Sequence, residues 1–418
     1  MKRGLKLLKV LLKKHKNIIV FAAVIIFTAL FVYFGNALFK NREQNDDNIV
    51  YCKAKIISIV GVDKTTNDYG NEIQLITFTA KIKSGPKKGS EIYCTQVIDS
   101  TYMVMQDKAV GKGNSILLIY MVDPESGIDD WTFAGYNRAD ALMVLCGIFL
   151  LLILIIGRKK GLNTIISLVS TCLIIFFVYI PSIISGFNVY LSTAVCGVVI
   201  IFTGLLLING ANKKTLCAIF GNLCGVLIAA LLAFVMTKVM KMTGFLDEQY
   251  VFLSFVSSEK PLNLVAIIWG GMVIGALGAI MDVAMSIASS MHELAEHMSD
   301  RSFLKMLRSG MNIGRDAIGT MTNTLILAYI GGSLALVLLL LVYTKDMLHL
   351  FSLEMIAAEV VQAITGSMGI LFAVPFTALC AAYMYNKKSE NFENECKKQN
   401  ETEENEIPAA EEKGEDAW

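Results

Sequence analysis

Long apolar runs constrain this chain more than any other feature of its sequence. A run of about 20 predominantly apolar residues is the length with which an α-helix crosses a hydrocarbon core of about 30 Å. Hydrophobic residues make up 55% of the 418 residues and charged residues only 17%, whereas about a quarter of the residues in a soluble domain are charged. An ordinary soluble fold is therefore excluded, and the sequence predicts a polytopic membrane protein.

Eight runs are long and apolar enough to be membrane spans. They lie at residues 18–39, 139–156, 162–180, 189–208, 215–237, 263–285, 320–343 and 363–385. The first run exceeds the apolar region of about 7–15 residues in a cleaved signal peptide, and no clear cleavage site follows it, so we interpret it as an uncleaved anchor. The predicted fold class is a mainly α-helical polytopic membrane protein with about eight transmembrane helices.

Basic residues cluster on one side of these expected spans. The clusters are residues 1–17, 158–160, 213–214, 301–315 and 387–388. Because cytoplasmic loops carry an excess of Lys and Arg, the positive-inside rule predicts that both termini are cytoplasmic. The charged tail at 386–418 is rich in Glu, Asn and Lys and is expected to be disordered.

Residues 40–138 follow the anchor and differ in pattern from the rest of the chain. Short β-prone runs alternate there with turn signals such as SGPKKG and GKGN, which predicts a small extracytoplasmic all-β domain before a helical membrane domain at 139–385 of about seven spans. Cys52 and Cys94 could form a disulfide in an oxidising compartment, but the spacing leaves two buried free thiols equally open. No histidine lies in the domain, and we expect it to bind or to gate.

Asp282 is the most informative residue in the apolar runs. An ionisable group within or beside a span is expensive and suggests work on an ion or solute path. Asp282 lies about 30 Å along a helix that begins near Leu262, toward its cytoplasmic end, so an interfacial carboxylate is the alternative. Ser286, Ser289 and Glu293 follow at steps of three or four residues and would extend a polar stripe toward the cytosol.

Uncharged polar residues in other spans are further candidates for an ion or solute path. They are Asn222, Thr320, Asn323, Thr324, Thr365 and Ser367. Such groups more often form hydrogen bonds between helices than bind a ligand. Gathered around one cavity, they would form a pathway with Asp282.

Small residues and one proline predict how two of the spans pack and bend. Gly271, Gly275 and Ala279 recur every four residues, a spacing that lets another helix approach closely. The last span contains three residues that favour a kink or hinge. These are Gly366, Gly369 and Pro375.

Motifs for catalysis, metals and cofactors are lacking. In the stretch from His292 to His297 the two histidines are five residues apart, so they do not share a helix face as the two zinc ligands of H-E-x-x-H do, and no third ligand is evident. No nucleotide-binding motif and no nucleophile–base pair is visible. We therefore expect no enzyme activity, no metal, no cofactor and no nucleic-acid partner.

Residues 299–318 form a basic amphipathic segment. It places Arg301, Lys305 and Arg308 among apolar residues such as Phe303 and Leu307. A segment of this type can lie along the anionic inner leaflet, and it could equally dock a soluble protein partner.

Three stretches within residues 275–377 resemble a known family. The stretches MDVAMSIASSMHEL, GRDAIGTMTNTLILAYIGGS and EVVQAITGSMGILFAVPFT are similar to those of the YibE/F family of bacterial multi-pass membrane proteins. The resemblance implies an N-terminal anchor, an external domain and a C-terminal helical domain of about seven spans. It implies no established activity and no assigned functional residues.

The order of features around Asp282 is also similar to the last three helices of SecF and of RND-type proton-driven proteins. Both have an acidic span, a connector, a Thr-rich helix start and a final span with Gly and Pro. That resemblance would give Asp282 the place of a proton-relay acid, with residues 320–324 opposite it. The chain departs from the pattern by two extra spans and by the lack of a paired basic residue.

Two functional hypotheses follow from these observations. The first is a secondary transporter or export-assisting permease, coupled to protons through Asp282, that moves protons or a small solute. The alternative is a non-transporting membrane scaffold or sensor whose external β-domain binds a partner.

Overall fold

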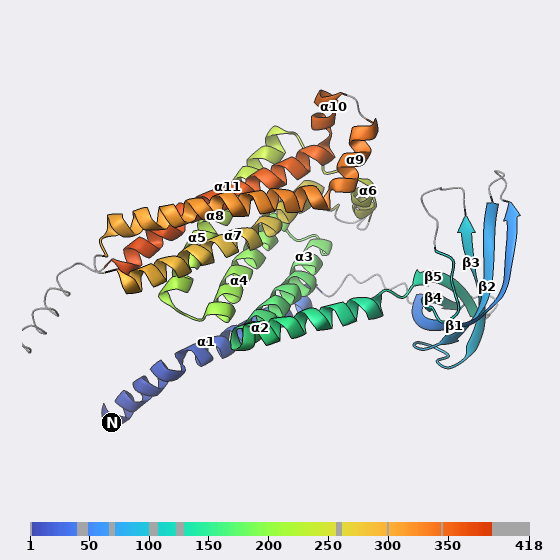
Figure 1. The fold of residues 1–418 in the computed structure, drawn as a ribbon, viewed down its shortest axis with the longest axis horizontal. Helices are drawn as coiled ribbons and strands as arrows, with labels where there is room; N and C mark the ends of the chain where they lie inside the picture. The colour runs from blue at the N-terminus through green and yellow to red at the C-terminus, as the bar shows by residue number, and fades with distance from the viewer. Residues whose placement is uncertain are drawn as a thin grey trace, which may run out of the picture. The chain divides into compact units, whose positions relative to one another are not determined.

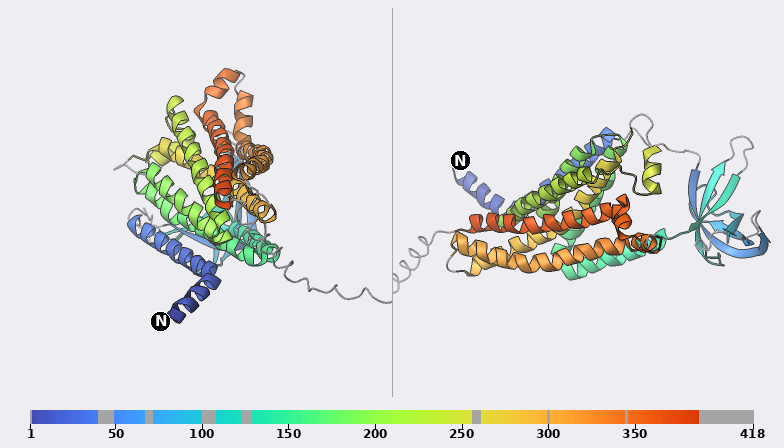
Figure 2. Two further views of the ribbon diagram at one scale, coloured as in Figure 1. Left: turned by 90° about the vertical axis from the view of Figure 1, so that its left-hand side faces the viewer. Right: turned by 90° about the horizontal axis from the view of Figure 1, so that it is seen from above.

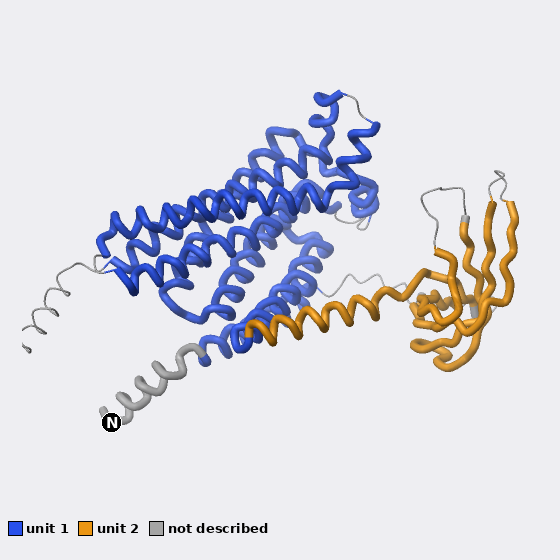
Figure 3. Tube along the Cα trace, in the orientation of Figure 1, with its two compact units in different colours: residues 1–42, 158–418 blue, residues 43–157 orange. Residues whose placement is uncertain are grey.

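The computed structural model describes residues 2–39, 49–66, 72–99, 108–122, 129–255, 261–298, 301–343 and 346–386. The chain divides into two compact units, one formed by residues 1–42 with 158–418 and the other by residues 43–157 (Figure 3). The expected disordered tail, apart from residue 386, lies outside the described residues.

The first unit is a bundle of long helices (Figure 1). Its segments are α1 (Lys2–Phe39), the second half of α2 (Ala139–Ile174), η2 (Ile175–Tyr179), α3 (Ile180–Ile184), α4 (Val189–Asn209), α5 (Lys213–Val239), α6 (Glu248–Phe255), α7 (Leu264–His297), α8 (Phe303–Gly332), α9 (Leu334–Tyr343), α10 (Met347–Ser352) and α11 (Glu354–Tyr385). Side-chain caps define the starts of α4, α7 and α10. Asn188 accepts from the amide of Tyr190, Asn263 from that of Ala266, and Asp346 from that of Leu348.

Six of the described helical segments are long and apolar enough to cross a membrane, or seven if the bent pair α8 and α9 is one span. One candidate, Ala139–Ile184, has 46 residues and would be about 69 Å long, which is more than twice the hydrocarbon thickness of about 30 Å. Arg158 interrupts it with φ 49° and ψ −126°, between the two spans that the sequence predicts at 139–156 and 162–180. The count of eight spans stays a prediction, and it differs from the structure at this segment and at the bent pair.

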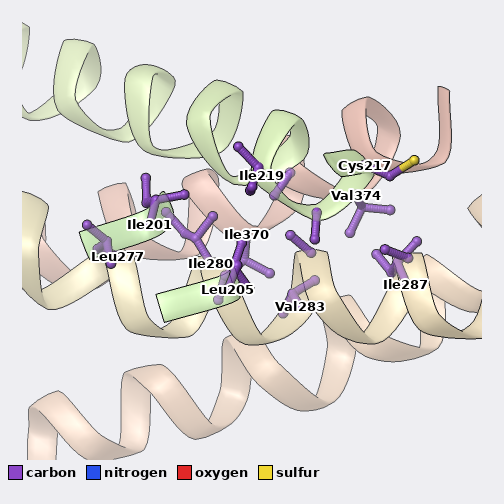
Figure 4. Packing of buried hydrophobic residues seen from close by; sticks show 14 of the residues in the cluster. Ile201, Leu205, Cys217, Ile219, Leu277, Ile280, Val283, Ile287, Ile370 and Val374 are labelled. Carbon is purple, nitrogen blue, oxygen red and sulfur yellow. The ribbon is translucent and has the colours of Figure 1, made fainter. Parts of the chain in front are cut away.

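The centre of the bundle is formed by α5, α7 and α11, with α8 alongside α7 and α11 (Figure 1, Figure 2). Buried apolar side chains from these helices fill the space between them, including Ile280, Val283 and Val374 (Figure 4). Glycines set the separation of the backbones. A Cβ atom at Gly225 would lie 2.8 Å from the carbonyl oxygen of Gly369. Small residues thus bring helices together where lipid supplies no hydrophobic driving force between them.

The expected packing role of the α7 glycines is only partly found. Gly271 is exposed, and a Cβ atom placed there would meet nothing within 4 Å, so the prediction of close helix packing at this position is wrong. Gly275 does face neighbours, because its Cβ would lie 3.0 Å from the Tyr329 hydroxyl and 3.3 Å from the Gln362 amide nitrogen. Ala279 is half-buried against the core.

Helix α11 continues from Glu354 to Tyr385 through Pro375. Both glycines of the expected hinge have packing roles. A Cβ atom at Gly366 would lie 3.1 Å from the Leu325 side chain, and one at Gly369 would clash with the Ile280 side chain. The kink or hinge in α11 stays a prediction. A bend of 63° lies between α8 and α9.

The second unit contains a five-stranded antiparallel sheet and the start of α2. Its strands are β1 (Ile49–Thr66), β2 (Glu72–Ile82), β3 (Glu91–Asp99), β4 (Ser115–Val122) and β5 (Asp129–Tyr136), in the order β3-β2-β1-β4-β5. Register shifts in β1 near Ser58 and Gly61 add twist to this long strand. The Cys94 thiol donates to the Trp131 carbonyl over 3.3 Å and joins β3 to β5. The sheet is rolled into a half-barrel, which confirms the small all-β domain.

The two cysteines of the sheet, Cys52 and Cys94, are free, buried thiols. Cys52 lies on β1 and Cys94 on β3, and β2 separates these strands. Of the two alternatives that the sequence left open, the structure therefore has two free thiols and no disulfide between Cys52 and Cys94. Burial raises the pKa of both thiols, which disfavours the reactive thiolate.

Candidate functional site

Asp282 lies on the face of α7 that points away from the bundle core. Its side chain is exposed, whereas Ile280 and Val283 on either side of it are completely buried. Asp282 is about 27 Å along the helix from Leu264. The helix therefore places a carboxylate on its outer face, well inside an apolar segment of 34 residues.

The predicted polar stripe is present on this outer face of α7. Ser286 and Glu293 are exposed and Ser289 is half-buried. Gly271 and Gly278 are exposed on the same helix. We call the face with Asp282, Ser286 and Glu293 the outer stripe.

Helix α8 runs antiparallel to α7 and passes Asp282. Gly314 of α8 is near Ile287 of α7, since a Cβ atom at Gly314 would lie 3.6 Å from the Ile287 side chain. Further along α8, Leu325 is near the earlier α7 residue Ala276, because both are next to Gly366 of α11. Asp282 is between Ala276 and Ile287 along α7, so the stretch of α8 between Gly314 and Leu325 runs past it. That stretch contains the predicted residues Thr320, Asn323 and Thr324.

The hydroxyl groups of this stretch differ in their bonding. Thr320 donates to the carbonyls of Asp316 and Ala317 at 3.3 and 3.2 Å, and Thr324 donates to Met321 at 2.9 Å. Thr320, Asn323 and Thr324 are all exposed. The Thr322 hydroxyl oxygen is buried and has no hydrogen-bond partner among the described residues.

On α11 the two predicted hydroxyls bond to their own helix. Thr365 donates to the carbonyl of Val361 at 2.7 Å, and Ser367 to that of Ala363 at 2.8 Å. This back-bonding satisfies a hydroxyl without a ligand. It is the structural role that the sequence left open for both residues.

Asn222 on α5 is the most unusual polar group of the core. It is fully buried, and neither its amide oxygen nor its amide nitrogen has a partner among the described residues. Leaving a buried polar group unpaired costs about 1–3 kcal/mol. Asn222 lies in the interior while Asp282 faces outward, so the structure does not collect all predicted polar residues around one cavity.

A second group of polar and sulfur-containing side chains lies where α5 begins and where α7 and α11 end. The Cys217 thiol donates to the Met384 sulfur over 3.4 Å. The His292 ring stacks on Tyr385 with centroids 5.5 Å apart. No spacing in the sequence shows that helices so far apart in the chain bring these side chains together.

The stretch from His292 to His297 pairs within itself. His292 Nε2 lies 3.5 Å from Glu296 Oε1. Within the described ranges, no group of three or more His, Cys, Asp and Glu side chains could hold a metal ion.

The amphipathic segment at 299–318 forms the first half of α8 from Phe303 onward. Its buried residues Met306, Gly310 and Gly314 face the bundle, and Gly310 contacts Met291. The apolar side of the segment thus packs on its own chain, and its basic side remains the candidate surface for lipid or a protein partner.

Comparison with known proteins identifies the family. A family model described as YibE/F-like protein matches residues 145–387, which is more than half of the chain. The chain belongs to the YibE/F-like family. This confirms the resemblance found in residues 275–377, and with its long apolar helices this YibE/F-like chain is a multi-pass membrane protein. No curated protein and no solved structure matches it.

Proposed function

We propose that this YibE/F-like protein is a proton-coupled secondary transporter or export-assisting permease of the bacterial cell membrane, with Asp282 as the proton-binding group. The observation that carries the proposal is the position of Asp282, exposed on the outer face of an apolar helix. A carboxylate at such a place rarely faces lipid and usually faces water, a pathway or another protein group.

Protonation gives Asp282 a means of coupling. The ionised carboxylate is costly to remove from water, while the neutral acid costs far less. Uptake of a proton therefore favours a state in which the outer stripe is closed to water, and release favours an open state. A helix that moves between these states would carry protons with its substrate.

The bent pair α8 and α9 supports a transport role. Broken helices are tolerated at membrane depth where their freed backbone groups line a cavity or are buried in protein, and transporters use them at substrate sites. The bend follows Gly331 and Gly332, and Ser333 covers part of the freed backbone by donating its hydroxyl to the Tyr329 carbonyl at 2.7 Å. The same α8 runs past Asp282 before it reaches the bend.

The orientation is part of the proposal. With both termini in the cytoplasm, α7 runs from Leu264 on the outside toward His297 on the inside, and the outer stripe leads from Asp282 to the cytosol. The proton would then be exchanged with the cytoplasm along Ser286 and Ser289.

Proton flux through the purified protein tests this function. The full-length chain is reconstituted in liposomes, a pH gradient is imposed, and the internal pH is followed with a dye for wild type, Asp282→Asn and Asp282→Glu. We expect flux in wild type and Asp282→Glu and the rate of empty liposomes in Asp282→Asn, because only the asparagine removes the titratable group.

Complementation of a deletion strain tests the same proposal for the case in which the protein moves protons only together with its substrate. Asp282→Asn should fail to restore the phenotype, and Asp282→Glu should restore it. Full complementation by a stably expressed Asp282→Asn protein would overturn the proposal.

The scaffold or sensor alternative is favoured by one observation, the compactness of the β-unit as a separate body. Deleting residues 45–135 separates the two functions. A scaffold that binds through this domain loses all activity, whereas a transporter with its path in the helical unit keeps measurable flux.

A further inference from the structure

The β-unit contains an open pocket lined mainly by lysines. The pocket has a volume of about 660 Å³. Its lining includes five lysines and no acidic residue: Lys55, Lys81, Lys83, Lys88 and Lys112. Ile57 and the buried side chains of Ile56 and Ile82 supply an apolar floor.

None of these five lysines is in an ion pair within the described part of the chain. Two other lysines of this unit do pair there, Lys53 with Asp140 at 2.6 Å and Lys64 with Glu72 at 3.6 Å. Two of these lysines have an acidic neighbour, because Glu91 on β3 is opposite Lys81 and Asp140 interacts electrostatically with Lys83, while the pocket lining itself contains no acidic residue. The pocket therefore holds a local excess of positive charge.

The placement of two of the lysines works against the stability of the sheet. Lys55 on β1 is directly opposite Lys81 on β2, and like charges in that position are destabilising. Lysines often protect exposed sheet edges from pairing with other chains, but β1 is the central strand here and β2 is also internal. Edge protection does not explain this pair, whereas an anionic ligand between the two ammonium groups would.

The pocket lies close to the point where this unit enters the membrane. Lys53 on β1 is two residues before Lys55, and its ion pair holds the strand to Asp140 in the first turn of α2. Lys112 is in the turn before β4, where the Gly113 amide donates to the Ile56 carbonyl at 2.9 Å. The apolar segment Ala139–Ile184 begins one residue before Asp140, so the basic pocket is at the membrane end of its own unit.

We propose that this pocket binds the phosphate groups of anionic phospholipids in the leaflet where α2 enters the bilayer. Lysine is a common phosphate ligand that acts as a point charge, and clusters of basic residues beside a span are attracted to anionic lipid headgroups. The apolar floor suits the carbon atoms next to a headgroup phosphate. This binding site is independent of the transport function proposed above.

Lysine labelling of the intact protein tests the site. Full-length protein is placed in nanodiscs of phosphatidylcholine, of phosphatidylcholine with phosphatidylglycerol, and of phosphatidylcholine with added inorganic pyrophosphate. Acylation rates of individual lysines are measured by peptide mass spectrometry. We expect phosphatidylglycerol to slow the acylation of the five pocket lysines about threefold or more and to leave the acylation rate of Lys64 unchanged. We expect 1 M NaCl to remove this protection, because it screens charges beyond about 3 Å.

The double variant Lys55→Gln/Lys81→Gln gives a second measurement on the three remaining pocket lysines. Their protection by phosphatidylglycerol should be lost, while the matched variant Lys64→Gln should keep it. Removing the Lys55–Lys81 repulsion should not lower the thermal stability of the protein.

Two results would overturn the inference. The first is equal labelling rates for the pocket lysines of the wild-type chain in all three conditions. The second is protection by pyrophosphate with none by phosphatidylglycerol, which would assign the pocket to a free anion. Protection by both reagents would still place lipid phosphate in the pocket.

Discussion

The two faces of α7 handle polar groups in opposite ways. The inner face, toward α5 and α11, consists of Ala276, Ile280, Val283, Ala284 and Ile287, all of which are almost completely buried. The outer face carries Asp282 and Ser286 in exposed positions. Packing accounts for the inner face residue by residue, but it gives no reason for a carboxylate on the outer one. The outer face of α7 is therefore the better candidate for function, because packing does not explain its carboxylate.

The largest difference is expected between two glycine-to-valine substitutions, one at Gly225 of α5, which faces the inner side of α7, and one at Gly278 on the outer side of α7. At Gly225 in the core, a Cβ atom would be 2.9 Å from both Ala373 and Ile280, so Gly225→Val should cost at least about 3 kcal/mol or prevent folding. Gly278→Val on the outer side of α7 meets nothing within 4 Å and should change stability by about 0.5 kcal/mol or less. Thermal unfolding in detergent, followed by size-exclusion chromatography, measures both. Equal losses would show that the outer side is also closely packed.

A smaller effect is expected at the unpaired amide of the core. Asn222→Leu removes two buried polar atoms without partners among the described residues and keeps a similar volume, so the protein should gain about 1–3 kcal/mol. Asn323→Leu, at an exposed amide of α8, should change stability by about 0.5 kcal/mol or less. The melting temperatures of the two variants give the comparison. A loss of stability in Asn222→Leu would mean that a water molecule or a solute satisfies the amide, and the core would then join the candidate path.

The smallest effect is expected where a hydroxyl bonds only to its own helix. Thr365→Val removes the 2.7 Å bond to Val361 but keeps the shape of the side chain. Hydrogen bonds between membrane helices average only about 0.6 kcal/mol, so losing this bond within one helix should cost about 0.6 kcal/mol or less. Thr377 on the same helix is also buried and bonds to Ala373 at 2.7 Å, so Thr377→Val is a matched control with the same expected loss. A loss above about 2 kcal/mol at Thr365 alone would show that its hydroxyl serves a partner on another helix.

Much of the fold could be predicted because lipid imposes simple rules on sequence. Runs of about 20 apolar residues predict helices, and the alternation in residues 40–138 predicts a small β-domain; both kinds of element are present. The basic residues at 158–160 indicate an interruption between two runs, and Arg158 has non-helical backbone angles there. How sharply the chain turns at Arg158 depends on tertiary packing and not on local composition. The separation of Cys52 from Cys94 depends on strand order, and β-prone runs do not encode that order.

The candidate site could be predicted in part. The spacing of Asp282, Ser286 and Glu293 places them on one helix face, and the structure has them there. Spacing could not show that this face points away from the core, since glycine at position 271 suits close packing and open space equally. The pairing of Cys217 with Met384 joins residues 167 positions apart, a contact that only the folded chain makes.

The bend after Gly332 has a consequence for how this part of the chain can cross a membrane. Helix α9 has ten residues and is about 15 Å long, half of the hydrocarbon thickness of about 30 Å. A helix of this length is too short to cross the hydrocarbon core alone, so α9 can take part in a membrane span only together with α8.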